Sequence, residues 1–474
     1  MDLSHRLLIA NQWRTADAVL PVINPFTGQP CGLVPLGDEA LLDEAIGASH
    51  AAFPSVRAIP AHARAALLRA IAEGIRKRQS EFVEALVSEV GKPLVFAEAE
   101  VTRAAMTFQC ASEEAGRPQG ELLALDALPT GEGHFGLARR FPLGVIAAIT
   151  PFNFPLNLVA HKIAPCIASG NTMVVKPAPK APLSALLLAE VLLESGLPAG
   201  QINFVTCPNE AAAMLARDER IAKVSFTGSA PVGWQLKALC GRKRITLELG
   251  GNAAVIVHSD ADLAAAIPAI AMGGFGQAGQ SCISVQRIAV HEDRYEEFRA
   301  GLIAQIQTTI RTGDPRDRAT IVGPLINAEA LRRVQGQIAG AQRAGARLVH
   351  GGGTFGPCLE ATVLEDLDPG CDLARQEAFA PVVTLHRYRE FEDALNFVND
   401  SAFGLQAGVY TRDIGLAMRA YAALDVGGVL INQVPTWRVE NMPYGGIKDS
   451  GFGREGIRYA MEEMTELKSQ VLRL

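Results

Sequence analysis

Cys282 stands in a sequence context that could support nucleophilic chemistry. It follows the glycine-rich run 273–279 and comes directly after Gln280 and Ser281. Glycines allow a substrate or cofactor to approach the backbone closely, and a thiolate is a strong nucleophile. Because free cysteines are often buried and inert, a structural cysteine is the competing interpretation.

Two other residues could assist such a thiol. Glu248 lies between two leucines at the end of a predicted strand, where apolar neighbours raise the pKa of a carboxyl group toward the range that suits a general base. A strand-end salt bridge is the alternative there. Asn153 lies between two phenylalanines, and its amide could donate to an oxyanion or could simply form a turn.

The segment 226–233 predicts a strand that runs through a Gly/Ser turn into a helix. Free N–H groups and the helix dipole favour a phosphate group at such a helix start. The segment lacks the full Gly-x-Gly-x-x-Gly spacing, so a plain turn with a helix cap is the alternative.

These motifs lie on short β-branched runs that alternate with amphipathic segments. We predict strands at 145–149, 173–176, 202–205, 223–226, 245–249 and 253–257, and helices at 157–168, 184–194, 210–216 and 231–239. This alternation is typical of a parallel sheet covered by helices. Residues 38–115 have helical periodicity, and we expect them to pack around the same sheet.

A second alternation follows residues 250–251 and predicts a second α/β domain. Its predicted elements are helices at 263–272, 295–311 and 328–344 and strands at 284–291 and 380–387. Two segments, 120–141 and 457–474, fit neither pattern. The first alternates apolar and polar residues around a turn at 131–133, which favours a hairpin.

The composition argues against several classes of protein. The 474 residues carry 44 Lys+Arg against 50 Asp+Glu, a formal charge of −6, without a long basic run, so we expect no nucleic-acid partner. No uninterrupted apolar stretch reaches the roughly 20 residues that cross a bilayer, so we expect no membrane partner. The eight cysteines and nine histidines show neither a disulfide framework nor a metal-ligand spacing. We therefore expect a cytoplasmic protein without a metal site.

Seven motifs occur in an order that resembles the aldehyde dehydrogenase superfamily over nearly the whole chain. They are residues 151–155, 174–178, 226–229, 248–251, 279–282, 377–382 and 443–451. The resemblance implies an α/β fold in which residues 1–119 and 142–250 form a Rossmann-type NAD(P)-binding domain and residues 251–456 a catalytic domain. It also implies that 120–141 and 457–474, a hairpin and a C-terminal strand, form a small β oligomerisation element of a homodimer or homotetramer.

The resemblance also implies a mechanism. The Cys282 thiolate would attack the carbonyl of a small aldehyde, while the Asn153 amide and the Cys282 backbone N–H hold the oxyanion. After hydride transfer to nicotinamide, Glu248 would deprotonate the water that hydrolyses the thioester. A CoA-acylating semialdehyde dehydrogenase and a catalytically silent binding protein on the same fold are the alternatives. The presence of Glu248 argues against the first, and the three residues together argue against the second.

The cofactor implied is NAD or NADP. By resemblance Lys176 would bind the adenosine ribose, Ser229 would meet the pyrophosphate, and Glu377 with Phe379 would position the nicotinamide ribose and ring. The full predicted set is Ile149, Thr150, Pro151, Phe152, Lys176, Ala178, Pro179, Phe226, Thr227, Gly228, Ser229, Leu249, Gly250, Glu377 and Phe379. Pro179 stands where many NAD-preferring members carry a glutamate, so the preference is open.

The predicted substrate-binding residues are Arg103, Asn157, His161, Ser281 and Arg438. Asn157 and His161 are four residues apart and share one helix face, and the resemblance places the two arginines on the walls of the aldehyde tunnel. The pattern is similar to lactaldehyde, phosphonoacetaldehyde and glyceraldehyde-3-phosphate dehydrogenases, so we expect a small polar or anionic aldehyde. Ser281 and Phe154 lack the basic groups of some phosphonate-using members, which disfavours a phosphonate.

Surface ion pairs are the competing interpretation of the two arginines. Arg103 would then pair with Glu98, Glu100 or Asp126, and Arg438 with Glu440.

The choice of cofactor can be tested at Pro179. We expect Pro179→Glu to depress turnover with NADP roughly tenfold more than turnover with NAD, because the new carboxylate repels a 2′-phosphate. Steady-state kinetics with each cofactor measure the two effects. Equal losses with both cofactors would show that this position does not face the adenosine ribose.

Overall fold

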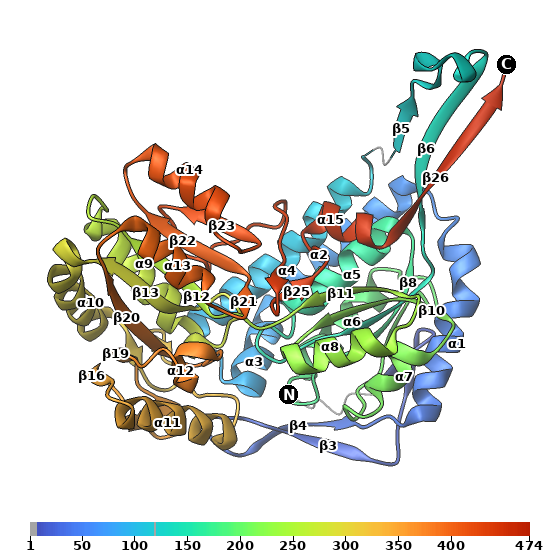
Figure 1. Cartoon of the computed structure of the whole chain (residues 1–474). Coiled ribbons are helices and arrows are strands. Elements are labelled where there is room, and N and C mark those ends of the chain that lie inside the picture. The colour runs from blue at the N-terminus through green and yellow to red at the C-terminus, as the bar shows by residue number, and fades with distance from the viewer. Residues whose placement is uncertain (1–6, 118–119) are drawn as a thin grey trace.

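The computed structural model describes residues 7–117 and 120–474. Residues 1–6, where the predicted NAD(P)-binding domain begins, and 118–119, at its first predicted boundary, lie outside the described residues. The described chain forms two lobes, each built on a mostly parallel sheet, and an arm of three strands that projects from one lobe (Figure 1). No helix in these ranges is long and apolar enough to span a bilayer.

The first lobe contains an eight-stranded sheet in the order β2-β1-β9-β8-β7-β10-β11-β25. Its strands are β1 (Leu7–Ile9), β2 (Gln12–Arg14), β7 (Val145–Ile149), β8 (Thr172–Lys176), β9 (Ile202–Phe204), β10 (Ile221–Thr227), β11 (Arg244–Glu248) and β25 (Gly451–Phe452). The five strands from β9 to β11 are parallel, and antiparallel strands add at both edges. The strand order reverses between β7 and β10, and ligands of open α/β sheets bind at such a switch point, beyond the carboxyl ends of the strands.

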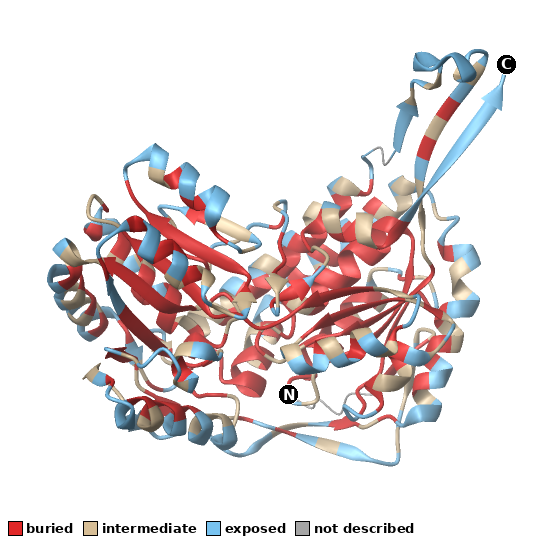
Figure 2. Ribbon diagram, viewed as in Figure 1, coloured by how far each residue is buried: buried red, intermediate tan, exposed pale blue. Residues whose placement is uncertain are grey.

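Alternate residues of β7 pack into cores on opposite faces of this sheet, as the pleat of a strand requires. Ile146 and Ala148 pack on one face, and Val145, Ala147 and Ile149 on the other. The first face is covered by α2 (Ala61–Lys77), α3 (Gln79–Val90), α4 (Leu94–Glu114), α5 (Asn157–Ser169) and α6 (Leu183–Glu194). The second is covered by α1 (Glu39–Val56), α7 (Ala212–Arg217) and α8 (Ala230–Leu239). Figure 2 shows the central strands of both sheets as buried.

The second lobe contains a seven-stranded sheet in the order β16-β19-β20-β13-β12-β22-β23, in which β16 alone is antiparallel to its neighbour. Its strands are β12 (Ala253–Val257), β13 (Val285–His291), β16 (Arg347–His350), β19 (Thr362–Glu365), β20 (Val382–Tyr388), β22 (Gln406–Tyr410) and β23 (Gly428–Ile431). The helices are α9 (Leu263–Phe275), α10 (Tyr295–Thr309) and α11 (Ala328–Arg343) on one face, α13 (Phe391–Asn399) and α14 (Ile414–Ala423) on the other, and the short α12 (Asp372–Arg375).

Short paired strands complete the two lobes. They are β3 (Val19–Ile23) with β4 (Pro30–Pro35), β14 (Arg311–Thr312) with β15 (Thr320–Val322), β17 (Thr354–Phe355) with β18 (Cys358–Leu359), and β21 (Phe403–Gly404) with β24 (Ile447–Lys448).

The arm consists of β5 (Gly120–Leu123), β6 (His134–Pro142) and β26 (Thr465–Arg473), with β6 in the centre. β6 and β26 pair antiparallel over nine residues each. The arm is mostly exposed in Figure 2, and its exposed side chains include several large apolar ones. These are Leu122, Leu128, Phe135, Leu467, Val471 and Leu472.

The predicted hairpin differs from the structure at its turn. β5 ends at Leu123 and β6 begins at His134, so the turn predicted at 131–133 is only the last part of a longer connection. The chain passes through two 3-10 turns, η1 (Leu125–Ala127) and η2 (Pro129–Gly131), before β6 begins. The antiparallel pairing of the two strands is present as predicted.

The predicted C-terminal strand also differs from the structure in its first half. Residues 457–463 form α15 (Ile457–Glu463), and the strand begins only at Thr465. Ile457, Met461 and Met464 pack into the core of the first lobe. Their spacing of three and four residues is the helical signal that explains this difference.

Candidate active site

A cavity of about 530 Å³ opens between the two lobes, beyond the carboxyl ends of β7, β10 and β11. Most of the predicted site residues line it, and they come from both lobes. They are Arg103, Pro151, Phe152, Asn153, Asn157, His161, Thr227, Gly228, Ser229, Glu248, Leu249, Gly250, Ser281, Cys282, Glu377, Phe379 and Arg438. Motifs separated by more than a hundred residues therefore meet in one place.

Cys282 lies in the cavity wall, just after the 3-10 turn η3 (Gly276–Gly279). The backbone turns sharply here, with left-handed conformations at Gln277, Ala278 and Gly279. Cys282 Sγ lies 3.2 Å from the hydroxyl of Tyr444. Burial raises the pKa of the Cys282 thiol to about 12, while the contact with Tyr444 acts to lower it. The geometry therefore presents one thiol to the cavity and one hydroxyl to that thiol.

Glu248 ends β11 and is buried against the same cavity. Within residues 7–117 and 120–474, neither of its carboxyl oxygens has a hydrogen-bond partner. Burial, reinforced by the nearby Glu455 carboxylate, raises the pKa of Glu248 well above its usual range. A carboxyl group that is free of partners and easily protonated can exchange a proton with a water in the cavity.

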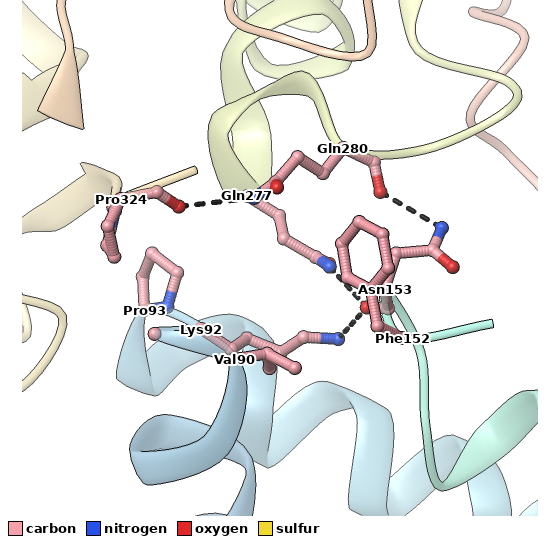
Figure 3. Close-up of a pocket in the computed structure, with 10 residues that line it drawn as sticks. Val90, Lys92, Pro93, Phe152, Asn153, Gln277, Gln280 and Pro324 are labelled. Carbon is pink, nitrogen blue, oxygen red and sulfur yellow. Dashed lines mark hydrogen bonds between the residues drawn. The ribbon is translucent and has the colours of Figure 1, made fainter. Parts of the chain in front are cut away.

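Asn153 is held by its backbone and by its side chain (Figure 3). Its carbonyl oxygen accepts hydrogen bonds from Lys92 Nζ at 2.8 Å and from Gln277 Nε2 at 2.5 Å. Its side-chain Nδ2 donates to the carbonyl oxygen of Gln280 at 3.0 Å. Because Gln277 and Gln280 belong to the loop that carries Cys282, these bonds fix the amide relative to the thiol.

The anchor of Asn153 is a buried ion pair. Lys92 Nζ contacts the carboxylate of Glu100, and both side chains are fully buried. The ammonium group also lies 4.0 Å from the centre of the Phe154 ring. Glu100 Oε1 accepts the backbone N–H groups of Leu156 and Asn157, at 3.0 and 3.1 Å, and so caps the start of α5.

Glu440 contacts two nitrogen-bearing side chains of the cavity wall. Arg103 Nε donates to Glu440 Oε1 at 2.6 Å, and His161 Nε2 lies 2.7 Å from Glu440 Oε2. Burial alone would raise the pKa of Glu440, but His161, Arg103 and Arg438 hold it well below its usual range. Asn157 Nδ2 lies 3.3 Å from His161 Nε2 and extends this network.

Glu455 is a second ionised carboxylate in the same network as Glu440. Lys162 Nζ donates to Glu455 Oε1 at 3.1 Å, and Arg438 Nη2 lies 3.7 Å from Glu455 Oε2. Burial opposes ionisation, but Lys162, His161 and Arg438 keep the pKa of Glu455 far below its usual range.

The competing interpretation, in which the two arginines form surface ion pairs, is wrong about their partners. Arg103 pairs with Glu440, because α4 turns this side chain toward the cavity. The ion pair of Arg438 is with Glu455. Glu98 pairs instead with Arg318.

The remaining predicted cofactor residues lie outside the cavity lining, along the same edge of the first sheet. Ile149 pairs with both Phe226 and Lys176 on neighbouring parallel strands. The N–H of Thr150 donates to the carbonyl oxygen of Lys176 at 3.2 Å. Lys176 Nζ donates to Asn209 Oδ1 at 3.0 Å. Two further predicted residues, Ala178 and Pro179, follow on the same loop and are half-buried.

This edge fits a dinucleotide. The Ser229 side chain makes no capping hydrogen bond to the first N–H groups of α8, which begins directly after it, so these groups are available to a phosphate. Thr227 Oγ1 is buried and has no hydrogen-bond partner in the described part of the chain. A Cβ atom at Gly250 would lie 2.7 Å from Glu377 Oε2, so a larger residue here would displace this carboxylate.

Nearly the whole chain matches known proteins. Residues 13–470 match the aldehyde dehydrogenase family. The chain belongs to this family. The 3-sulfolactaldehyde dehydrogenase of Priestia aryabhattai is 38% identical over 469 residues, which cover 99% of this chain and 98% of that protein. The predicted family is thereby confirmed.

Solved structures of aldehyde dehydrogenases share the fold. Aldehyde dehydrogenase 21 from Physcomitrella patens, in complex with the reaction product succinate, matches with a TM-score of 0.97 and 39% identity, covering 100% of this chain and 99% of that chain. The glyceraldehyde-3-phosphate dehydrogenase GapN from Methanocaldococcus jannaschii, complexed with NADP, matches with a TM-score of 0.92 and 35% identity. The match covers 96% of this chain and 99% of that chain. The protein is an NAD(P)-dependent aldehyde dehydrogenase with the α/β fold of that family.

Several residues of this aldehyde dehydrogenase site were not singled out by the sequence patterns. Lys92 lies in the Gly-Lys-Pro break between two helical segments, and Tyr444 lies inside the motif 443–451. Glu440 and Glu455 lie in loops without a recognisable pattern. One local signal is present for the buried ion pair. Lys92 lies among apolar residues, eight positions before Glu100.

The anchor of Asn153 can be tested by removing it in two ways. We expect Lys92→Met to lower the free energy of unfolding by about 3–5 kcal/mol, because it leaves the buried Glu100 carboxylate unpaired. The double variant Lys92→Met/Glu100→Gln should recover most of this stability, since a neutral amide oxygen still caps α5. Its kcat should stay low, because the Asn153 carbonyl keeps only the Gln277 donor and loses the one from Lys92.

Urea unfolding and steady-state kinetics on wild type and both variants separate the two effects. A double variant that regains wild-type kcat together with its stability would contradict a positioning role for Lys92.

Proposed function

We propose that this enzyme oxidises a small aldehyde that carries an anionic group to the corresponding carboxylate. The observation that carries the proposal is a set of unsatisfied arginine donors in the cavity. Arg103 Nη2, Arg438 Nε and Arg438 Nη2 are buried without a hydrogen-bond partner among the residues that the structure describes. Buried donors of this kind require an acceptor, and a carboxylate or sulfonate oxygen supplies one.

The ion-pair network around Glu440 and Glu455 supports an anion. Its cations Arg103, Arg438 and Lys162 outnumber these two ionised carboxylates, and the two arginines line the cavity. The names of similar proteins point the same way, since one acts on 3-sulfolactaldehyde and another is bound to succinate.

The arrangement of the residues supports the following catalytic roles. The Cys282 thiolate attacks the aldehyde carbon and forms a C–S bond, and the carbonyl oxygen becomes an oxyanion held by the Asn153 amide. The residues at the carboxyl edge of the first sheet would hold the nicotinamide cofactor, which would supply the hydride acceptor. Glu248 then takes a proton from the water that attacks the thioester, which releases the carboxylate and restores the thiol.

Water as the acceptor is favoured over coenzyme A by the placement of Glu248. A hydrolytic base has to stand free beside the thioester, and Glu248 lines the cavity with both oxygens unpartnered within the described ranges. An enzyme that transfers the acyl group to a thiol has less use for such a base.

We further propose that the arm joins copies of the chain into a homodimer or homotetramer. A three-stranded sheet that projects from its lobe with large apolar side chains exposed would be stabilised by burial against a second copy. The eight cysteines are all unpaired, which supports a reducing compartment, the cytoplasm.

The role of Glu248 predicts a separation of two kinetic phases. We expect Glu248→Gln to retain a first-turnover burst of reduced cofactor, while steady-state turnover falls about a hundredfold, because only the hydrolytic step needs the base. In wild type, turnover should rise with pH, since the raised pKa keeps Glu248 protonated until the solution becomes more alkaline.

Rapid mixing with saturating aldehyde measures the burst, and mass spectrometry detects the acyl group on Cys282. Absence of both in folded Glu248→Gln protein would remove Glu248 from the hydrolytic step. Cys282→Ala serves as the control that shows neither signal.

The anion site predicts a substrate-dependent loss of affinity. We expect Arg103→Leu and Arg438→Leu to raise the KM for a carboxylated or sulfonated aldehyde by about ten- to a hundredfold, because a charge-assisted hydrogen bond contributes about 1.5–3 kcal/mol. Lactaldehyde should be affected modestly and propanal little.

Arg318→Leu is the matched control, because Arg318 is exposed and pairs with Glu98 outside the cavity. Steady-state kinetics on the three aldehydes give the comparison, and a loss of folded protein lowers all three rates together. Equal increases in KM for all three aldehydes would eliminate the anion site.

A further inference from the structure

Tyr444 brings a hydroxyl group to the sulfur of Cys282, and nothing in the mechanism above uses it. The distance from Tyr444 Oη to Cys282 Sγ is 3.2 Å. In the part of the chain that the structure describes, this hydroxyl is the one polar group within hydrogen-bond distance of the sulfur.

The position of Tyr444 is fixed from several sides. Its backbone N–H donates to the carbonyl oxygen of Glu455 at 3.0 Å, and its own carbonyl oxygen accepts the N–H of Glu455 at 2.7 Å. Its side chain packs with Ile283 and Leu405. The Arg438 guanidinium lies 3.7 Å from the centre of its ring. Only 5% of the residue is exposed, so the hydroxyl has little freedom to leave the sulfur.

The chemistry of the pair sets the direction of the hydrogen bond. A thiolate has no proton, so the tyrosine must be the donor whenever Cys282 is ionised. Burial, followed by the proximity of Cys282, raises the pKa of Tyr444 well above its usual range, so the hydroxyl keeps its proton. A cation over the ring, here Arg438, draws electron density from the phenol and makes the O–H a better donor.

We propose that Tyr444 is a catalytic residue whose hydroxyl donates a hydrogen bond to the Cys282 thiolate and so increases the fraction of enzyme that can attack the aldehyde. The proposal rests on the proposed function of Cys282 as nucleophile. In the attack the sulfur lone pair forms the C–S bond, the negative charge passes to the aldehyde oxygen, and Tyr444 keeps its proton throughout.

Stabilising a thiolate has two opposite effects on its reaction. Lowering the pKa of a thiol by one unit raises the thiolate population about tenfold, as long as the pH lies below the pKa. The intrinsic nucleophilicity falls only about threefold, because its dependence on basicity is shallow. The net gain is therefore about threefold to fourfold, and it holds across the pH range in which the thiol is mostly protonated.

The other charged groups around Cys282 remain in place when the hydroxyl is removed. Glu377 and Glu248 oppose ionisation of the thiol, and Arg438 favours it. Tyr444→Phe retains the ring under Arg438 and the packing against Ile283, so it deletes the donor alone. Any change in the reactivity of Cys282 then reports on the hydroxyl.

The test is the rate at which iodoacetamide alkylates Cys282, followed by mass spectrometry of its peptide from pH 6 to pH 11 without cofactor. We expect Tyr444→Phe to be alkylated about threefold to fourfold more slowly than wild type on the rising part of the profile, and to need about half a pH unit more for the same rate. The kcat/KM for aldehyde should fall in the same direction.

Tyr388→Phe is the matched control. Tyr388 is also buried, and its hydroxyl lies 2.9 Å from His258 Nδ1 in the second lobe, away from the cavity lining. Its alkylation profile at Cys282 should equal that of wild type. An equal or faster rate in folded Tyr444→Phe would overturn the proposal, since the hydroxyl would then be a spectator or a steric lock on the thiol.

A second measurement does not depend on the folding of the variant. Incorporation of 3-fluorotyrosine makes every phenol more acidic and hence a stronger donor, so alkylation of Cys282 should need a lower pH. An unchanged or higher pH requirement would count against the proposal. Retention of aldehyde oxidation after complete alkylation of Cys282 would instead refute the proposed nucleophile, so the two failures are distinguishable.

Discussion

The buried ion pair of Lys92 with Glu100 is the interaction on which the active site depends. Two charges removed from water are costly unless their remaining hydrogen-bonding capacity is used. Here Lys92 also donates to the Asn153 carbonyl, and Glu100 also accepts two backbone N–H groups at the start of α5. The hydrogen bonds of the pair thus fix the segment between β7 and α5, which carries Asn153, and the start of α5, which carries Asn157 and, one turn further on, His161.

The two lobes are joined by hydrogen bonds that pass through Ser450. Its hydroxyl donates to the carbonyl oxygen of Gly250 at 2.7 Å and accepts the N–H of Gly404 at 2.9 Å, and its carbonyl oxygen accepts the N–H of Leu249 at 3.0 Å. The chain leaves Glu248 in the first lobe and returns beside it as β25 after crossing the second. The cavity is lined by Glu248 from the first sheet and by Cys282 from a loop of the second lobe, and this return holds the two sides together.

The regular core was predictable from local pattern. The strands predicted at 145–149 and 253–257 match β7 and β12 residue for residue, because a buried parallel strand is a short β-branched run between turns. The family motifs also brought the predicted catalytic residues to one cavity. What could not be predicted depends on pairs that are distant in sequence. Arg103 and its partner Glu440 are 337 positions apart, and no local periodicity records such a pair.

The order of synthesis has a consequence for the arm. Pro142 in β6 pairs with Thr465 in β26, so 323 residues must be added before the pairing can begin. At about 5–20 residues per second this takes roughly 16–65 seconds, during which one edge of β6 has no partner. An open strand edge beside Phe135 is an aggregation hazard in a nascent polypeptide. Until β26 has been made, this edge of the arm therefore needs protection from other chains.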